Sequence, residues 1–469
     1  MLRVLPGVHA TPPRLKRSYG GNGNVNLQYV PSASRVPRRR AASRRASDNE
    51  AVNVTPIEEL HAALPFSLEA WNTFMREYWQ KRPVVIRGAT LPGESMPIDA
   101  GELAGLACEP EFQPRIIRNK SGKPSEWKLE RGPFAEEELR ALPEDGTWCV
   151  VVNDLEKHVP EVATLLDLFD HFPRWRVADI QASLSAEGGG VGAHSDQFDV
   201  FLIQGEGQKL WSISDNPEYA PENEDAFYAE AEVKVLRDFQ PRESSLLEPG
   251  DVLYLPPKVA HHGVAKGSDT VCTTYSVGFL APTRDDLVLS LAQSTVDTGE
   301  GTRRWSDPWL EPQENVGMIS AKAVTQASTI IREAMPKDDA GFARWFGCHV
   351  TAGYSLESEG FVADDKITDD DFLTTWIERE SLFPRADVKF AFVDEVSDGS
   401  LEGSLFFAAG DVWELLSDRG AELARHIANR GEIVAEDWVE HNETGFRMET
   451  EAQSLLHDLF SSGYLFLED

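Results

Sequence analysis

The stretch from about residue 175 to residue 280 constrains the fold of this chain most strongly. Its segments are short, rich in Val, Ile, Leu, Phe and Tyr, and separated by clusters of Gly, Pro and Asp. Short strands joined by tight turns produce this pattern, because Gly and Pro end a strand and favour a turn. The sequence therefore predicts an antiparallel β sandwich or barrel at the centre of the chain.

Segments with helical periodicity lie on both sides of this β region. "LEAWNTFMREYWQKRPVVIRGA" predicts an amphipathic helix followed by a short strand. Just before it, "TPIEELHAAL" offers Thr55 as an N-cap with Glu58 three positions later, a capping-box pattern that predicts another helix. Beyond residue 282, "TRDDLVLSLAQSTVDT" and "ISAKAVTQASTIIREAM" predict helices, and from residue 379 strands and helices alternate in a small α+β module.

The charge is distributed unevenly along the chain. Ten of the 45 Lys and Arg lie in residues 1–47, which hold no Asp or Glu, so 35 remain against all 78 acidic residues, a net charge of -43. Such a body argues against direct nucleic-acid binding and favours basic partners. The Arg- and Ser-rich start fits either an organelle transit peptide or a disordered tail. No run approaches the roughly 18 apolar residues of a membrane span, so no membrane association is expected.

His194 and Asp196 stand two positions apart in "GGGVGAHSDQFDVFLIQGEGQKLW", residues 188–211. Side chains at i and i+2 of a strand point to the same face, so both can bind one metal ion inside a barrel. The glycines just before them are expected to let the backbone pass close to a bound group. A His-x-Asp pair arises by chance in many chains, so the interpretation needs a third ligand.

The third ligand is offered by "LEPGDVLYLPPKVAHHGVA", residues 247–265, where a Pro-Gly-Asp turn and a buried strand precede His261 and His262. Two histidines and one carboxylate form the facial triad of non-haem Fe(II) oxygenases. Adjacent residues of a strand face opposite ways, so only one of the two histidines can join the triad. The residues alone leave open which one.

These motifs resemble those of the JmjC/cupin-type 2-oxoglutarate-dependent ribosomal oxygenases, most closely the bacterial arginine hydroxylases of that family. The resemblance covers nearly all of residues 66–469. Besides the two motifs above, "WQKRPVVIRGA", "YSVGFLAPT", "WFG" and the terminal "SSGYLFLED" are similar to segments of that family and occur in the same order.

The resemblance implies a role for particular residues. His194, Asp196 and His261 would bind the metal, because the family's third ligand follows the Pro-Pro pair by four positions. Lys209, fifteen positions after the first ligand, would bind the distal carboxylate of 2-oxoglutarate, although the most similar bacterial enzymes have Arg there. Ser276 would contact the same co-substrate. Asp179 and Gln197 are expected near the mouth of the barrel, where they could contact the substrate.

The resemblance also implies the fold class. A mainly β catalytic domain, a double-stranded β-helix of the JmjC/cupin type, is expected to be followed by a helical dimerisation segment and a small winged-helix-like C-terminal domain. We expect a basic leader or transit peptide over residues 1–52, the catalytic domain over 53–281, the helical segment over 282–378 and the C-terminal domain over 379–469.

The function implied is hydroxylation of a basic ribosomal protein, on an Arg side chain, with Fe(II), 2-oxoglutarate and molecular oxygen. The enzyme is expected to be a homodimer in the cytoplasm, or in a mitochondrion or plastid if the N-terminus is a transit peptide. Two alternatives remain at this point, a JmjC-type histone demethylase and a non-catalytic cupin that binds metal without turnover.

Overall fold

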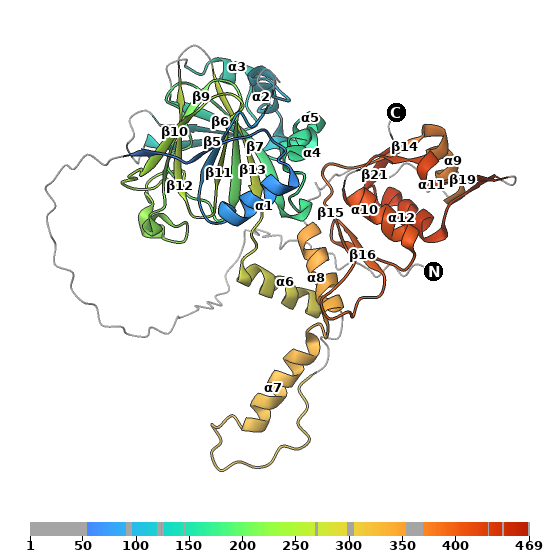
Figure 1. Ribbon diagram of the computed structural model, residues 1–469. Helices are drawn as coiled ribbons and strands as arrows, with labels where there is room; N and C mark the ends of the chain where they lie inside the picture. The colour runs from blue at the N-terminus through green and yellow to red at the C-terminus, as the bar shows by residue number, and fades with distance from the viewer. Residues whose placement is uncertain are drawn as a thin grey trace.

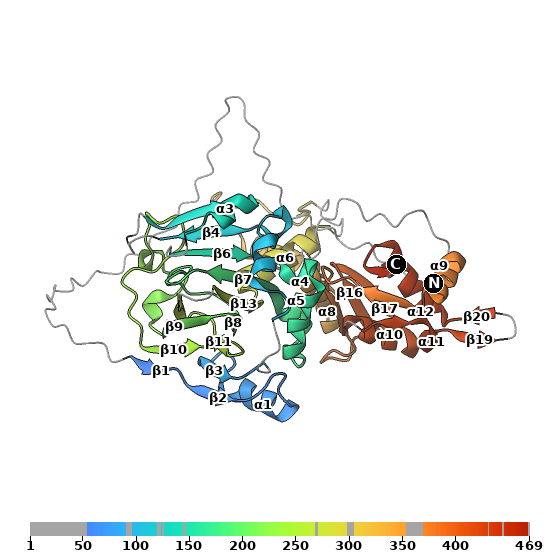
Figure 2. The same ribbon diagram turned by 90° about the horizontal axis from the view of Figure 1, so that it is seen from above.

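The computed structural model describes residues 54–90, 96–119, 123, 126–143, 147–267, 271–297, 304–352, 369–429, 431–442 and 445–467. The predicted leader, residues 1–52, lies outside them. Figures 1 and 2 show a β domain on one side, an α+β module on the other, and a helical segment between and below them. None of the helices in the described residues is long and apolar enough to span a membrane.

Two facing sheets form the β domain in the described part of the chain. The larger has the strand order β2 (Glu59–His61), β3 (Val84–Arg87), β11 (Val252–Leu255), β8 (Asp199–Gln204), β13 (Cys272–Phe279), β7 (Val177–Ser185), β6 (Trp148–Val152), β4 (Arg115–Arg118) and β5 (Lys128–Arg131). The smaller has the order β1 (Thr55–Pro56), β10 (Glu243–Leu247), β9 (Gln208–Ser214) and β12 (Ala260–Lys266). The predicted β sandwich is confirmed.

Short helices surround the sheets. They are α1 (Leu68–Glu77), α2 (Ala100–Leu106), α3 (Glu136–Arg140), α4 (Leu155–His158), α5 (Pro160–Ala163) and the 3-10 turns η1 (Pro110–Phe112), η3 (Thr164–Phe169), η4 (Arg174–Arg176), η5 (Pro217–Tyr219) and η6 (Glu224–Ala226). Helix α1 begins where the Ser67 hydroxyl accepts a hydrogen bond from the backbone of Ala70, and it buries Trp71 and Phe74. The predicted helix and the strand after it are confirmed.

Strand β8 is buried along its whole length because both of its faces are covered. Phe201 and Ile203 face the core beneath α1, where Phe201 meets Tyr254 at 4.9 Å between ring centroids. Val200 and Leu202 face the second core, which lies between the two sheets. Burial on both faces explains the nearly continuous apolar sequence of this strand.

The helix expected in "TPIEELHAAL" is wrong. Residues Thr55–Pro56 form β1, which pairs in parallel with Glu243 and Ser244 of β10. Residues Glu59–His61 form β2, which pairs in parallel with β3. The segment crosses from one sheet to the other, and the backbone hydrogen bonds that each sheet edge offers outweigh the local capping pattern.

The chain after the β domain is helical and then mixed. The helices α6 (Arg284–Asp297), α7 (Ala321–Ala334) and α8 (Asp339–Thr351) follow β13, and α6 and α7 lie where the sequence predicts helices. The C-terminal elements are α9 (Asp369–Arg379), β14 (Ser381–Pro384), β15 (Phe390–Val393), β16 (Ser404–Ala408), β17 (Asp411–Leu415), α10 (Asp418–Ala428), β18 (Ile433–Val434), α11 (Ala435–Trp438), β19 (Glu440–Asn442), β20 (Gly445–Arg447), α12 (Thr450–Ser461) and β21 (Leu465–Leu467).

The C-terminal module has its own core and also contacts the β domain. Helix α9 crosses the expected boundary at residue 378 and packs Phe372 and Trp376 into that core. Trp175 of η4 meets Phe346 of α8 at 5.4 Å between ring centroids. The buried Lys389 donates a hydrogen bond of 2.7 Å to the carbonyl oxygen of Val177, at the start of β7.

Candidate active site

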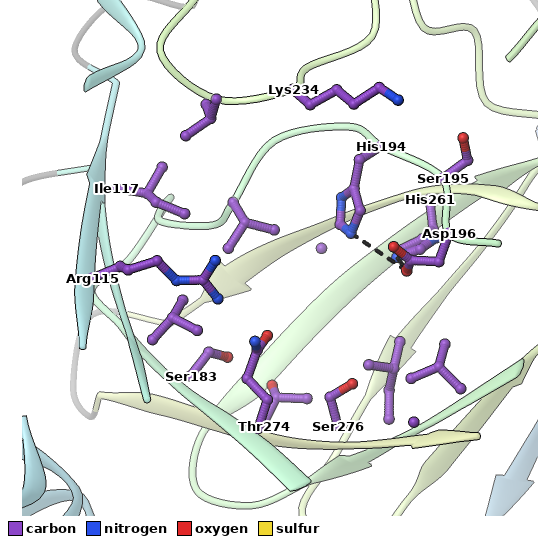
Figure 3. A pocket seen from close by; sticks show the side chains of 18 of the residues that line it. Arg115, Ile117, Ser183, His194, Ser195, Asp196, Lys234, His261, Thr274 and Ser276 are labelled. Atoms are coloured by element: carbon purple, nitrogen blue, oxygen red, sulfur yellow. Dashed lines mark ion pairs between the residues drawn. The ribbon is translucent and has the colours of Figure 1, made fainter. Parts of the chain in front are cut away.

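Three side chains with metal-binding atoms meet between the two sheets. His194 and His261 form an antiparallel bridge in which each backbone N–H donates to the other's carbonyl, at 3.0 and 2.7 Å. Asp196 Oδ2 lies 3.8 Å from His194 Nε2 and 3.6 Å from His261 Nε2. One ligand atom from each of the three lies within 4.8 Å of the others. Figure 3 shows the three side chains converging on one side of a pocket.

Hydrogen bonds fix how both imidazoles are presented. Nδ1 of His194 lies 3.0 Å from the carbonyl oxygen of Gly192, and Nδ1 of His261 lies 3.0 Å from that of Val259. A carbonyl oxygen can only accept, so each Nδ1 donates and each Nε2 keeps its lone pair toward Asp196. Burial and the neighbouring His194 lower the pKa of His261 to about 4, which keeps this imidazole neutral.

This set of donors fits a divalent iron. Two neutral imidazole nitrogens and one carboxylate oxygen are the ligands of the 2-His-1-carboxylate triad, and they leave positions free for other ligands. His262, the other candidate, faces the opposite side of β12 and packs its ring edge-on against Phe239, 6.3 Å between centroids. The structure therefore brings His261, and not His262, to His194 and Asp196.

The glycines before His194 serve a different purpose from the one that the sequence predicts. A Cβ atom on Gly189 would lie 2.1 Å from the carbonyl oxygen of Trp148, and one on Gly190 would lie 2.2 Å from that of Gly263. These glycines therefore let the chain pass tightly between strands of the protein itself, β6 and β12. The expectation that they make room for a bound group is wrong for these two positions.

The pocket beside the triad has a volume of about 480 Å³ and is lined from both sheets. Lys209 of β9 lies in it and is only 4% exposed. Its Nζ donates to Ser183 Oγ at 3.3 Å and to Thr274 Oγ1 at 3.2 Å. No carboxylate in the described part of the chain forms an ion pair with it. A buried ammonium with two hydroxyl partners and no counter-charge is costly, so an anionic ligand would stabilise it.

Ser276 and Thr274 line the pocket from the same face of β13. Thr274 contacts Lys209, as described above, whereas no hydrogen bond of the Ser276 hydroxyl occurs within the described residues. Sequence reasoning missed Thr274 and Ser183. The alternation that placed Ser276 in the pocket also places Thr274 there, and Ser183 follows from the same rule applied to β7.

The opposite wall of the pocket is polar and charged. Asp179 and Gln181 project into it from β7, and Arg115 and Ile117 from β4. Burial, together with Glu156 and Asp154, raises the pKa of Asp179 to about 6. The other predicted mouth residue, Gln197, is exposed and does not line this pocket. Nothing in the motifs pointed to Arg115, because β4 lies far from them in the sequence.

The chain is similar to known proteins over most of its length. A JmjC domain model matches residues 164–287. The chain is 32% identical over 283 residues to the ribosomal protein uL16 3-hydroxylase of Escherichia coli K12, which covers 59% of this chain and 70% of that enzyme. It is 26% identical over 318 residues to a probable ribosomal oxygenase of Haemophilus influenzae, covering 66% of this chain and 75% of that protein.

Solved structures agree with this match. The crystal structure of Escherichia coli YcfD is similar with a TM-score of 0.69 and 26% identity, over 87% of this chain and 100% of that one. A structure of the same ribosomal oxygenase in complex with cobalt and 2-oxoglutarate is similar with a TM-score of 0.67 and 26% identity, over 87% of this chain and 99% of that one.

Proposed function

This chain belongs to the JmjC-domain ribosomal oxygenases, which use Fe(II), 2-oxoglutarate and O₂, and we propose that it hydroxylates an arginine side chain of a basic ribosomal protein. The single observation that carries the proposal is one pocket that joins a metal triad, a buried lysine and a half-buried carboxylate.

We propose that His194, Asp196 and His261 hold the iron. The iron and 2-oxoglutarate, when bound, supply the oxidising power to insert one oxygen atom of O₂ into a C–H bond. The protein contributes the geometry: the backbone bridge between His194 and His261 fixes two ligands, and their Nδ1 hydrogen bonds fix the tautomer of each. Rigid presentation of the ligands is what places the reacting carbon at a constant distance.

Lys209 is the proposed anchor of the co-substrate. Its buried ammonium lies in the same pocket as the triad and has hydroxyl partners but no counter-ion there. A dicarboxylate that binds the metal at one end would place its other carboxylate at Lys209 and neutralise it. Thr274 and Ser183 hold the ammonium in place through their hydroxyl groups.

The charges around Asp179 support a cationic substrate side chain. Asp179 lines the pocket, where Asp154 and Glu156 oppose the ionisation of its carboxyl and Lys157 and Arg115 favour it. An incoming guanidinium would pair with the ionised carboxylate, whereas a neutral imidazole would not. This difference favours arginine over histidine as the hydroxylated residue.

The charge of the whole body supports a basic partner. Residues 48–469 hold 35 Lys and Arg against 78 Asp and Glu, as counted above. Long-range attraction between this surface and a basic ribosomal protein would speed their encounter, and salt would weaken it over a Debye length of about 10 Å at 0.1 M. We therefore propose a flexible basic loop as the substrate, entering the pocket in an extended form before ribosome assembly is complete.

The helical segment is the proposed dimer interface. Figure 1 shows α7 projecting away from both the β domain and the C-terminal module. Large apolar side chains are exposed on α6 and α7: Val288, Leu289, Val296, Val324, Ile330 and Ile331. A second copy of the chain would cover such a surface. Light scattering at micromolar concentration should give the mass of a dimer.

The C-terminal module is the proposed winged-helix-like domain, with the β19–β20 hairpin as its wing.

The function is tested by incubating the purified enzyme with Fe(II), 2-oxoglutarate and peptides tiled over the basic loops of uL16 and other ribosomal proteins. We expect one arginine-containing peptide to gain 16 Da, with stoichiometric succinate. A methylated histone tail serves as the contrast. Its demethylation in the absence of any hydroxylated ribosomal peptide would replace the proposal by the demethylase alternative.

A further inference from the structure

Arg115 reaches into the pocket from the wall opposite the triad, as Figure 3 shows. Its Nη2 donates a hydrogen bond of 2.9 Å to Asn153 Oδ1. Its Nε is fully buried and has no hydrogen-bond partner among the described residues. Burial and the nearby Arg131 lower the pKa of Arg115, in keeping with a cation that lacks acceptors. Since Asn153 is the one hydrogen-bond partner of this guanidinium among the described residues, its other N–H groups on the pocket wall can donate to a ligand.

The Arg115 guanidinium is held rigidly on its protein side. Asn153 Oδ1 also accepts a hydrogen bond of 2.6 Å from Gln181 Nε2, and Asn153 Nδ2 donates to the carbonyl oxygen of Gln113 at 3.2 Å. The side chains of Arg115, Asn153 and Gln181 therefore form one network across β4, the end of β6, and β7. A donor fixed in this way loses little conformational entropy when a ligand binds to it.

The chemistry of the other pocket groups limits what the acceptor can be. A substrate guanidinium is a like charge and carries no acceptor, so it cannot pair with Arg115. The distal carboxylate of 2-oxoglutarate has its own cation in Lys209. An extended peptide that enters the pocket brings main-chain carbonyl oxygens, which are neutral, strong acceptors and are present in every substrate.

We propose that Arg115 is a substrate-recognition residue whose guanidinium donates to a main-chain carbonyl oxygen of the substrate loop. The inference rests on the proposed function and deepens it, because it identifies a contact to the peptide backbone in addition to the charge contact of Asp179. The enzyme thereby recognises an extended backbone on one wall of the pocket as well as a cationic side chain.

The substitution Arg115→Met distinguishes a residue that binds the peptide backbone from one that only adds positive charge to the pocket. The two roles change the KM for peptide in opposite directions. If Arg115 only adds positive charge, Arg115→Met removes repulsion and the KM for a cationic peptide falls. If Arg115 binds the backbone, the KM rises by about tenfold or more, since a hydrogen bond to a charged group is lost. The KM for 2-oxoglutarate should rise far less than the KM for peptide, because the lost contact is made with the peptide.

A second pair of measurements identifies the acceptor. Arg115→Lys keeps the charge but loses the planar fork, and it should give a KM between those of wild type and Arg115→Met. In a series of peptides that each carry one thioamide in place of an amide, one peptide should bind wild type more weakly than the others. Its thioamide replaces the carbonyl that Arg115 contacts. The same replacement should make no difference to Arg115→Met. Arg118→Met is the matched control, because Arg118 lies on the same strand and pairs with Glu130 outside the pocket, at 2.9 Å.

A KM for peptide that falls or does not change in Arg115→Met overturns the inference while leaving the proposed function intact. So does a rise in the KM for 2-oxoglutarate alone, which would assign Arg115 to the co-substrate. Equal sensitivity of wild type and variant to every thioamide would rule out the carbonyl contact. Failure of the wild type itself to hydroxylate any basic peptide would contradict the proposed function and the inference together.

Discussion

The two ends of the pocket carry opposite electrostatic deficits. At the end formed by β9, β12 and β13, the buried ammonium of Lys209 has two hydroxyl partners and no ion pair within the described residues. At the end formed by β4 and β7, Asp179 lines the wall, and burial together with Glu156 and Asp154 raises the pKa of its carboxyl. Each end therefore lacks a charge that a different ligand would supply: a carboxylate at Lys209 and a guanidinium at Asp179.

This difference gives the pocket a polarity that orders its two ligands. A dicarboxylate placed at the Asp179 end would meet like charge, and a guanidinium placed at Lys209 would do the same. In a water-poor cavity these repulsions are larger than at the surface. Binding in the right place is thus favoured, and binding in the wrong place is opposed. The predictions below test each end separately.

The largest effect is expected at the metal. His261→Ala removes a proposed ligand, and turnover should fall by more than about a thousandfold, as expected when the group that carries the chemistry is lost. His262→Ala, the matched control one residue along β12, should keep turnover within about threefold, because its ring packs against Phe239 outside the pocket. Succinate formation and Co(II) binding followed by visible absorption measure the two variants. Similar behaviour of the two would mean that the register of β12 is misassigned.

The next effect is at the co-substrate anchor. Lys209→Met should raise the KM for 2-oxoglutarate by roughly ten- to a hundredfold, since a charge-assisted hydrogen bond of about 1.5–3 kcal/mol is lost. Metal binding and the KM for peptide should change little, because the Asp179 end is untouched. Lys266→Met, exposed near the end of β12, is the control. If the KM for 2-oxoglutarate is unchanged, Lys209 does not bind the co-substrate. This end of the pocket then has no missing charge to compare with the other end.

The third effect is at the other end and depends on pH. Burial raises the pKa of Asp179 to about 6, and only the ionised carboxylate attracts a cation. Affinity for an arginine peptide should therefore be full above about pH 6 and fall as the pH drops through that value, by up to about tenfold per unit. Asp179→Asn should abolish this dependence and bind at the low-pH level throughout. A pH profile of the peptide KM that is the same in both proteins would contradict the assignment.

The same raised pKa affects stability in the opposite direction. Between about pH 4 and pH 6 the folded protein holds a proton that the unfolded chain has lost, so stability falls as the pH rises through this window. Asp179→Asn should lack that fall, and chemical denaturation at several pH values measures it. A loss of stability in the variant at pH 8 would show instead that the carboxylate supports the fold.

The two ends also differ in how far the sequence could predict them. His194 and Asp196 belong to one motif, and the second motif supplies the third ligand from β12, so the family resemblance predicts their convergence. The expected strand at His194 and Asp196 is wrong: His194 forms an isolated bridge to His261, and Asp196 precedes β8 without belonging to a strand. Lys209 was placed by the family resemblance, which puts a basic residue fifteen positions after the first ligand. The choice between His261 and His262 required the resemblance, because alternation alone says only that they face opposite ways.

The Asp179 end could be predicted only in part. Asp179 was expected near the mouth, but Arg115 and Asn153 come from strands that meet β7 through long-range pairing, which no local pattern encodes. The missed strands at Thr55 and Glu59 have the same cause, since their partners lie on other strands of the sheets. The glycines before His194 were identified but misinterpreted, because their close contacts are with strands that the sequence could not place.

The smallest effects are expected from the two hydroxyls of β13, and they sharpen the comparison from within the Lys209 end. Thr274 Oγ1 accepts a hydrogen bond of 3.2 Å from Lys209, so Thr274→Val leaves the ammonium with Ser183 alone. This loss should raise the KM for 2-oxoglutarate by roughly two- to tenfold, the range of one hydrogen bond of about 0.5–1.5 kcal/mol.

Ser276 lies two residues further along the same face but makes no hydrogen bond within the described residues. If its hydroxyl contacts the co-substrate itself, as the family resemblance implies, Ser276→Ala should raise the KM for 2-oxoglutarate by about threefold or less. Without that contact the KM should not change. Both constants come from one series of succinate assays at saturating peptide. A larger effect for Ser276→Ala than for Thr274→Val would show that direct contact with the co-substrate outweighs the positioning of Lys209 at this end.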